Sequence, residues 1–177
     1  MGLANITDAD GKMVDVDDDF YSLATIDTIL KSIRDGLSYI ASYSLDIAGS
    51  ASHYGILTTP NASRYLHLNF KFSNESEVGL SIYENVTVSS SLAGTSLTAY
   101  NKNRDSSNTS SGLLYYSPTV TNVTLGSVRL YNRHFNGSEE KETGIIKLDA
   151  NKKYAFCFEN FSTAANYTSY SYEWIEQ

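Results

Sequence analysis

The chain of 177 residues is long enough for one ordinary domain with a sizeable core, and its 13 Lys and Arg against 20 Asp and Glu give a net charge of −7. An acidic surface repels the phosphate backbone, so the composition argues against a nucleic-acid partner. The single cysteine, Cys157, excludes an internal disulfide, and its apolar neighbours indicate a small buried side chain rather than a reactive thiol.

The N-terminal residues show no cationic stretch followed by an apolar one, and no apolar run approaches the roughly 18 residues of a membrane span. We therefore expect neither a signal peptide nor a membrane segment. Nine Asn-x-Ser/Thr triplets exceed the roughly three expected by chance, which indicates either a glycosylated exterior or many exposed turns. Residues 15–19 are rich in aspartate, and we expect a solvated turn there, with a cation site as the alternative.

From about residue 20 to residue 43, leucine and isoleucine recur at intervals of three and four, which predicts an N-terminal amphipathic helix with a heptad seam. The seam residues are Leu23, Ile26, Leu30, Ile33, Leu37 and Ile40. Gly36 would weaken the interior of this helix by about 1 kcal/mol relative to Ala. Residues 1–48 are thus interpreted as an arm and helix for assembly or anchoring, and residues 49–177 as a β domain.

The helix needs a partner. Burying six such side chains contributes roughly 9 to 18 kcal/mol, whereas ordering some twenty residues costs about 1 to 2 kcal/mol each. The helix must therefore pack either on the sheet of its own chain or on copies of itself, and leucine at a with isoleucine at d favours more than two strands.

Two alternating runs, residues 65–72 and 78–84, predict strands joined as a hairpin by a turn at residues 73–76. Further strands are expected at 113–117, 127–131, 144–148, 153–159 and 167–175. Short, regularly spaced strands without intervening helices predict a mainly β fold, an antiparallel β-sandwich of jelly-roll type.

A long polar tract, residues 98–120, lies between two of the apolar runs. Its asparagine and aspartate side chains can close Asx-turns, and its hydroxyl groups can bond to the backbone, so we expect an ordered loop. Arg104 is its long donor, and it could either hold the loop by bonding carbonyl groups or bind a ligand; we favour the first role.

The same tract carries a resemblance. Residues 98–110 and 116–120 resemble a pattern found in a family of tailed-phage virion proteins associated with the head surface as decoration or auxiliary capsid proteins. Residues 81–87 and 148–174 are also similar to that family, so the resemblance covers roughly residues 52–177. The heptad segment has no counterpart in it. The core of the motif comprises Tyr100, Asn101, Asn103, Arg104, Ser106, Ser107 and Asn108.

The resemblance implies a capsid decoration or cement protein, made in the host cytoplasm and bound to the major capsid protein on the virion surface. It makes the glycosylation triplets a matter of composition. Local three-fold positions are common decoration sites on icosahedral shells, and the seam tolerates three strands, so we expect a homotrimer.

The sequence contains no motif for catalysis or cofactor binding. His53, His67 and His134 lack the spacing of metal ligands. Glu139, Glu140 and Glu142 could be imagined as glycosidase carboxylates, but a solvated hairpin tip explains them more simply. The sequence therefore predicts neither enzyme activity nor a cofactor nor a metal.

Two other functions are compatible with the sequence. A carbohydrate-binding jelly roll, displayed on a virion or secreted, would stack sugars on exposed tyrosines or on Trp174, although a core position suits Trp174 better. A secreted eukaryotic glycoprotein would carry a signal peptide upstream and glycans on its asparagines.

Overall fold

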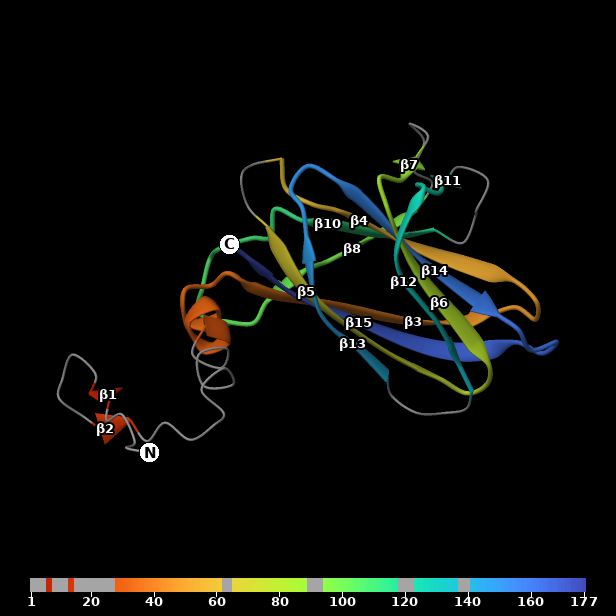
Figure 1. Ribbon diagram of the computed structural model, residues 1–177, viewed down its shortest axis with the longest axis horizontal. Coiled ribbons are helices and arrows are strands. Elements are labelled where there is room, and N and C mark those ends of the chain that lie inside the picture. Colours follow the sequence, from red (N-terminus) through yellow and green to blue (C-terminus); the bar gives the residue numbers. More distant parts are fainter. Residues whose placement is uncertain are drawn as a thin grey trace, which may run out of the picture.

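The computed structural model describes residues 6–7, 13–14, 28–61, 65–88, 94–117, 123–136 and 141–177. Two antiparallel sheets pack face to face as a sandwich, and a short helix, described over residues 28–34, lies at the end of the sandwich that also holds the C-terminus (Figure 1). The expectation of a mainly β sandwich with an N-terminal helix is therefore confirmed.

The first sheet has five strands in the order β13-β5-β15-β3-β9, and the second has six in the order β12-β6-β14-β4-β10-β8. The strands of the first sheet are β3 (Ser38–Ile47), β5 (Leu66–Asn74), β9 (Tyr100–Asn101), β13 (Lys141–Leu148) and β15 (Asn166–Glu176). Those of the second are β4 (Ser52–Thr58), β6 (Val78–Glu84), β8 (Thr95–Leu97), β10 (Leu113–Ser117), β12 (Val128–Phe135) and β14 (Lys153–Asn160). Two further pairs are β1 (Ile6–Thr7) with β2 (Met13–Val14), and β7 (Thr87–Val88) with β11 (Val123–Thr124).

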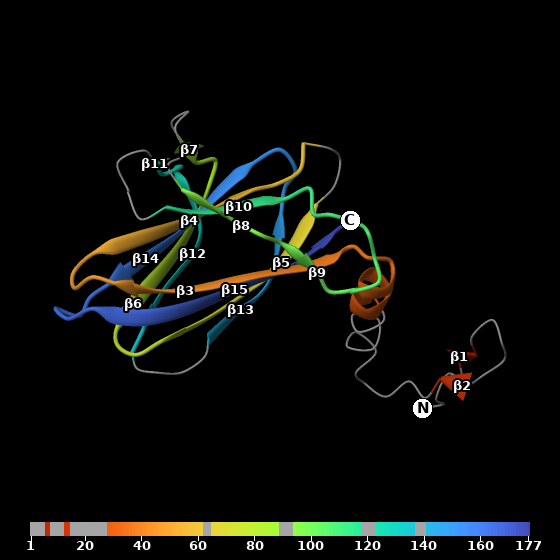
Figure 2. The same cartoon turned by 180° about the vertical axis from the view of Figure 1, so that it is seen from behind.

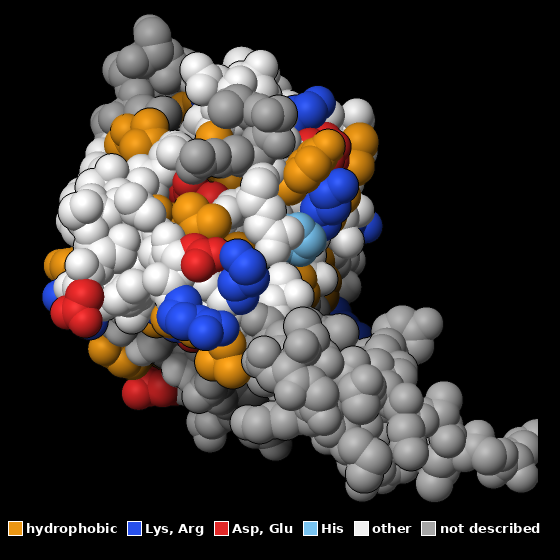
Figure 3. Space-filling model, turned by 90° about the vertical axis from the view of Figure 1, so that its left-hand side faces the viewer, with side chains coloured by type: hydrophobic (Ala, Val, Ile, Leu, Met, Phe, Trp, Pro, Cys, Tyr) orange, Lys and Arg blue, Asp and Glu red, His pale blue; other side chains and the backbone are white. Residues whose placement is uncertain are grey.

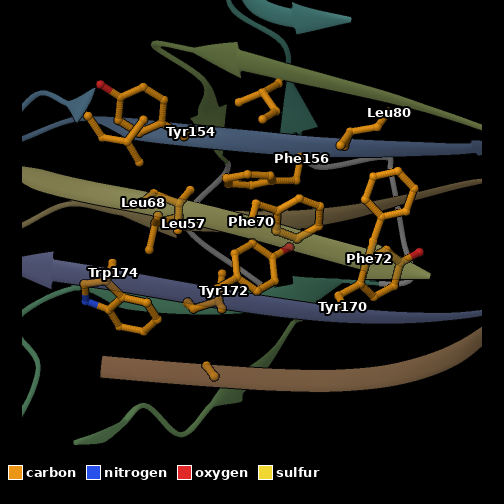
Figure 4. Close-up of a cluster of buried hydrophobic side chains, with 14 of the residues drawn as sticks. Leu57, Leu68, Phe70, Phe72, Leu80, Tyr154, Phe156, Tyr170, Tyr172 and Trp174 are labelled. Atoms are coloured by element: carbon orange, nitrogen blue, oxygen red, sulfur yellow. The ribbon is translucent and has the colours of Figure 1, made fainter. Parts of the chain in front are cut away.

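The core lies between the two sheets, and strict alternation in the central strands supplies it (Figure 4). Every second residue of β5 and of β15 is buried. Five of these eleven inward residues are aromatic, and aromatic rings contact one another across the sandwich, as Phe70 and Phe156 do with centroids 5.2 Å apart. Trp174 is 1% exposed and packs against Tyr39, so the idea that it forms an exposed sugar platform is wrong.

The expected hairpin of residues 65–72 and 78–84 is wrong in its pairing, although both strands and their inward faces are as predicted. β5 pairs with β13 and β15, whereas β6 pairs with β12 and β14 in the opposite sheet. Alternation fixes which face is buried but not which neighbour a strand has, because the apolar faces of two strands can meet across the sandwich as well as side by side. The side chain of Asn166 accepts hydrogen bonds from the N–H groups of Glu75 and Ser76, and so holds the turn in which the chain passes from β5 in one sheet to β6 in the other.

The N-terminal helix ends earlier in the chain than the sequence predicted. Residues 38–47 form β3, so Leu37 lies between helix and strand and Ile40 lies within the strand. The sandwich therefore begins at residue 38, not at residue 49. Tyr39 and Ala41 alternate inward in β3, and the spacing of Leu37 and Ile40 matched a heptad by coincidence. The helix ends because Gly36 adopts a φ of +68°, which takes the chain out of the helical conformation.

A buried polar cluster interrupts the aromatic core near the edge of the sandwich. His53 is 2% exposed, and its Nε2 lies 3.1 Å from the hydroxyl oxygen of Tyr43, whose ring stacks on Tyr116. Burial lowers the pKa of His53 to about 4, because the interior disfavours the charged imidazolium.

His53 should therefore make the fold sensitive to acid. The pKa of His53 is about 6.5 in the unfolded chain and lower in the folded one. The contribution of neutral His53 to the free energy of unfolding is therefore complete above pH 6.5, and it is lost as the pH falls towards 4, by at most about 3 kcal/mol. Urea unfolding of His53→Gln should show a shallower loss of stability across this range than the wild type. His67→Gln, on the outer face of β5, should keep the wild-type slope. Equal slopes for the wild type and His53→Gln would contradict the prediction.

Candidate functional site

Within the polar tract, residues 101–112 form an ordered loop that organises its own backbone. Asn101 and Asn103 each accept, at Oδ1, a hydrogen bond from the N–H two residues ahead, at 2.9 and 3.1 Å, which closes two successive Asx-turns. Ser106 does the same with its hydroxyl for Asn108 at 3.1 Å, and Ser110 for Gly112 at 3.0 Å. The mechanism expected from the sequence is thus the one that shapes residues 101–112.

The helix beside this loop ends in a Schellman motif. The N–H of Gly36 donates to the carbonyl of Ile33 at 3.0 Å, and the N–H of Leu37 donates to the carbonyl of Ser32 at 2.8 Å. These bonds satisfy two of the carbonyl groups that a helix leaves unpaired at its end. The carbonyls of residues 34–36 need other partners.

Three asparagine side chains of the loop provide those partners. The amide nitrogen of Asn103 donates to the carbonyl of Arg34 at 2.9 Å, and that of Asn101 donates to the carbonyl of Gly36 at 2.9 Å. The amide of Asn108 reaches the carbonyls of residues 35 and 36 at 3.2 and 3.3 Å. We call residues 34–36 together with the loop residues 101–108 the helix clamp. Its hydrogen bonds tie the N-terminal helix to the sandwich, and the loop that follows β9 runs beside the helix in Figure 2.

Contact within the helix clamp is close enough to require glycine. A Cβ atom placed on Gly36 would lie 2.1 Å from Oγ and 2.8 Å from Cβ of Ser106. Gly36 therefore serves twice, through its positive φ and through its lack of a side chain.

A buried carboxylate holds the other end of the loop. Glu176, the last residue of β15, is 1% exposed, and its Oε1 accepts hydrogen bonds from the Ser110 hydroxyl at 2.6 Å and the Ser111 N–H at 2.9 Å. The Gly112 N–H at 3.2 Å and the indole N–H of Trp174 at 3.3 Å donate to the same oxygen, and the Ser111 N–H also reaches Oε2 at 3.3 Å. Burial of a charged carboxylate is tolerable here because several donors converge on it.

The structure brings together two groups of residues that the sequence singled out separately. The loop motif and the end of the predicted helix form one site, although some seventy residues separate them in the chain. Leu30 lies on the helix and is 53% exposed, and Ile33 is half-buried. Leu23 and Ile26 lie outside the described residues, as do residues 15–19, Glu139 and Glu140.

Arg104 does not have the role expected of it. Its guanidinium is exposed and lies over the ring of Tyr100, 5.9 Å from the ring centroid, while the asparagine amides make the contacts that hold the helix. Ser107 is exposed. Gly36 and Glu176 were missed as site residues. Glycine followed by an apolar residue after a helical stretch is a C-terminal signal, and alternation along the last strand places Glu176 inward with Trp174.

The surface around this end is mixed in character. In Figure 3, cationic and anionic side chains lie next to one another among uncharged polar groups. The Lys102 Nζ, for example, donates to Glu173 Oε2 at 3.0 Å. Such a surface lacks the single-sign field that steers highly charged partners.

Elsewhere in the described residues, no group of three or more His, Cys, Asp or Glu is placed to hold a metal ion. Cys157 is a half-buried free thiol in β14, and burial raises its pKa, which keeps it protonated. Across the part of the chain that the structure describes, no helix has the length and hydrophobicity to cross a membrane. In comparisons with known proteins, no family model and no curated sequence matches the chain.

The glycine of the helix clamp gives a first prediction for the site. Gly36→Ala should lower the free energy of unfolding by about 2 kcal/mol or more, because it adds a clash with Ser106 to the roughly 1 to 2 kcal/mol cost of a left-handed backbone. Gly144→Ala is a matched control, since Gly144 has a φ of +75° with open space around it. Urea unfolding should show the smaller loss for Gly144→Ala, and equal losses would contradict the close contact.

The buried carboxylate gives a second prediction. Glu176→Gln keeps one acceptor oxygen but puts an N–H₂ group in place of the other, where it faces the N–H of Ser111, at a cost of about 1 to 3 kcal/mol. Hydrogen exchange at the amides of Ser111 and Gly112 should speed up by roughly ten- to a hundredfold. Glu173→Gln, on the outer face of the same strand, should leave these amides unchanged. Unchanged exchange in Glu176→Gln would show that the carboxylate does not hold the loop.

Proposed function

We propose that this chain is a non-enzymatic structural protein of a virus particle, a capsid decoration or cement protein that binds the outer surface of a head and stabilises it by subunit contacts. The observation that carries the proposal is the helix clamp. The loop that resembles the phage virion family is the loop whose side chains fix the N-terminal helix on the sandwich.

Rigid attachment suits an adhesive role. A cement protein adds binding energy between shell subunits, and every group that is already ordered before binding reduces the entropy lost on binding. The helix clamp orders the base of the N-terminal segment in this way. Exposed apolar side chains are present on both parts, with Leu30 on the helix 53% exposed and Tyr100 in the loop 55% exposed. These are the groups we assign to contacts with the major capsid protein or with sister subunits.

A homotrimer through the N-terminal segment remains part of the proposal. The helix ends earlier than the heptad pattern predicted, so Leu37 and Ile40 leave the seam, and of its described residues on the helix Leu30 is the exposed one. Leu23 and Ile26 would extend the seam towards the N-terminus.

Carbohydrate binding is the weaker alternative. Trp174 is buried, so exposed tyrosines would have to supply the stacking platform. The backbone of Tyr65 exchanges hydrogen bonds with that of Gln177, so Tyr65 lies beside the end of β15, whereas Tyr167 lies at the beginning of that strand. A strand of 11 residues spans roughly 35 Å, so these two rings cannot form one platform.

The composition of purified particles tests the function. Mass spectrometry of heads from the virus that encodes the chain should find it in a fixed ratio to the major capsid protein, and image reconstruction should place its density on the outer surface in three-fold clusters. Absence of the chain from particles would contradict the proposal.

The contact surface is tested by a matched pair of variants. Leu30→Lys should weaken binding to heads stripped of this protein by at least about tenfold, because it places a charge in an apolar contact. Leu113→Lys changes a leucine of similar exposure, 50%, on β10, and should bind as the wild type does. If the two variants bind equally, the helix is not the adhesive surface.

A further inference from the structure

The free edges of the two sheets are not equally protected. An edge strand exposes unpaired N–H and C=O groups that can pair with another strand, and proteins usually protect it with a bulge, with charged residues (lysine above all) or proline, or by keeping it short. β12 and β13 each carry a register shift, between Arg129 and Tyr131 and between Glu142 and Ile145. β8 has three residues.

β3 is guarded at one end only. β9 pairs with its residues Tyr39 and Ile40, and among the described strands nothing else pairs on that side, so Ala41–Ile47 has a partner in β15 alone (Figure 2). This stretch contains no glycine, proline, lysine or arginine, and its pairing with β15 runs without a register shift. Within the described residues it is a seven-residue stretch of regular edge that no further strand pairs, and Asp46 is its one charged side chain.

The direction of the unpaired groups follows from two hydrogen bonds. The carbonyl of Ser38 accepts from the Lys102 N–H on the β9 side at 2.8 Å, and the carbonyl of Leu37 accepts from the Glu176 N–H on the β15 side at 3.0 Å. Since successive residues of a strand point their backbone groups to opposite sides, the even-numbered residues face the free edge. The N–H and C=O groups of Ser42, Ser44 and Asp46 are therefore available there.

Side-chain burial agrees with an uncovered edge. Along the inward face of β3, Ala41 and Ile47 are 1% and 3% exposed, but Tyr43 and Leu45 between them are only half-buried. A further strand at this position would cover both side chains and extend the core.

The free stretch is complementary to itself. An antiparallel copy placed about a two-fold axis at Ser44 sets Tyr43 opposite Leu45 and Ala41 opposite Ile47 on the inward face. On the outward face, Ser44 meets its own copy, and Asp46 meets Ser42 rather than another charge. This register also avoids a conflict with β9. Ile40 already pairs with β9, and in this register it would lie opposite Ala48 of the other copy, which follows the end of β3.

We propose that a second copy of this chain pairs with β3 at its free edge, so that the two five-stranded sheets join across a two-fold axis into one continuous sheet. Ser42, Ser44 and Asp46 of each copy exchange hydrogen bonds with Asp46, Ser44 and Ser42 of the other, six bonds in all. The pairing does not use the helix, so it stands independently of the capsid role.

Cysteine cross-linking tests the register directly. In a Cys157→Ser background, Ser44→Cys would place two thiols opposite each other with Cα atoms about 5.5 Å apart, within disulfide range. In Ser42→Cys the two cysteines would be offset by four residues, roughly 13 Å, which is too far. With diamide as oxidant, Ser44→Cys should give a band of twice the 19.5 kDa chain mass and Ser42→Cys should not. Failure of Ser44→Cys to cross-link, or equal cross-linking by both, would overturn the proposal.

Sedimentation equilibrium provides a second readout with the native cysteine in place. Ser44→Lys sets two like charges opposite each other and should weaken self-association at least about tenfold, which lowers the mean mass at micromolar concentration. Ser42→Lys sets each lysine opposite Asp46 and should keep the wild-type mass. The same mass for Ser44→Lys and the wild type would overturn the proposal, as would a wild type that sediments as a single chain.

Discussion

The carbonyl groups at the C-terminal end of the helix need hydrogen-bond partners, and the architecture of this end of the molecule follows from how they obtain them. The Schellman bonds at Gly36 satisfy two of these groups, and asparagine amides from a distant loop satisfy the rest. The loop is ordered by the same side chains that bond to the helix, so each element defines the other. The buried carboxylate of Glu176 then fixes the far end of the loop.

Features set by residues close together in the chain could be predicted from the sequence, whereas contacts between distant segments could not. The Asx-turns at Asn101 and Asn103 follow from side chains that bond two residues ahead, so the sequence predicted them. Their amide bonds to residues 34–36 depend on how the chain folds back, which no local pattern encodes. For the same reason the inward face of β5 was predicted and its partner strands were not. Tertiary pairing also overrode the heptad pattern at Ile40.

The two proposals assign two kinds of contact surface to one fold. At the end of the sandwich, apolar side chains stand on a helix held in place by bonds to its backbone, which suits attachment to a large neighbour. Along β3, backbone groups that no other described strand pairs offer a surface that a second copy of the chain can complete. The first surface depends on side-chain burial and the second on hydrogen bonding, so substitutions can separate them. Both proposed roles use the fold for assembly rather than for catalysis.

The proposed attachment through the N-terminal helix depends on the rigidity of the helix clamp, and backbone ¹⁵N relaxation measures that property most directly. We predict order parameters of about 0.85 for the amides of residues 32–37 and 101–112, equal to those of the central strands. Values below about 0.6 in the loop, with rigid strands beside it, would show that the asparagine bonds do not persist in solution and would contradict the central claim.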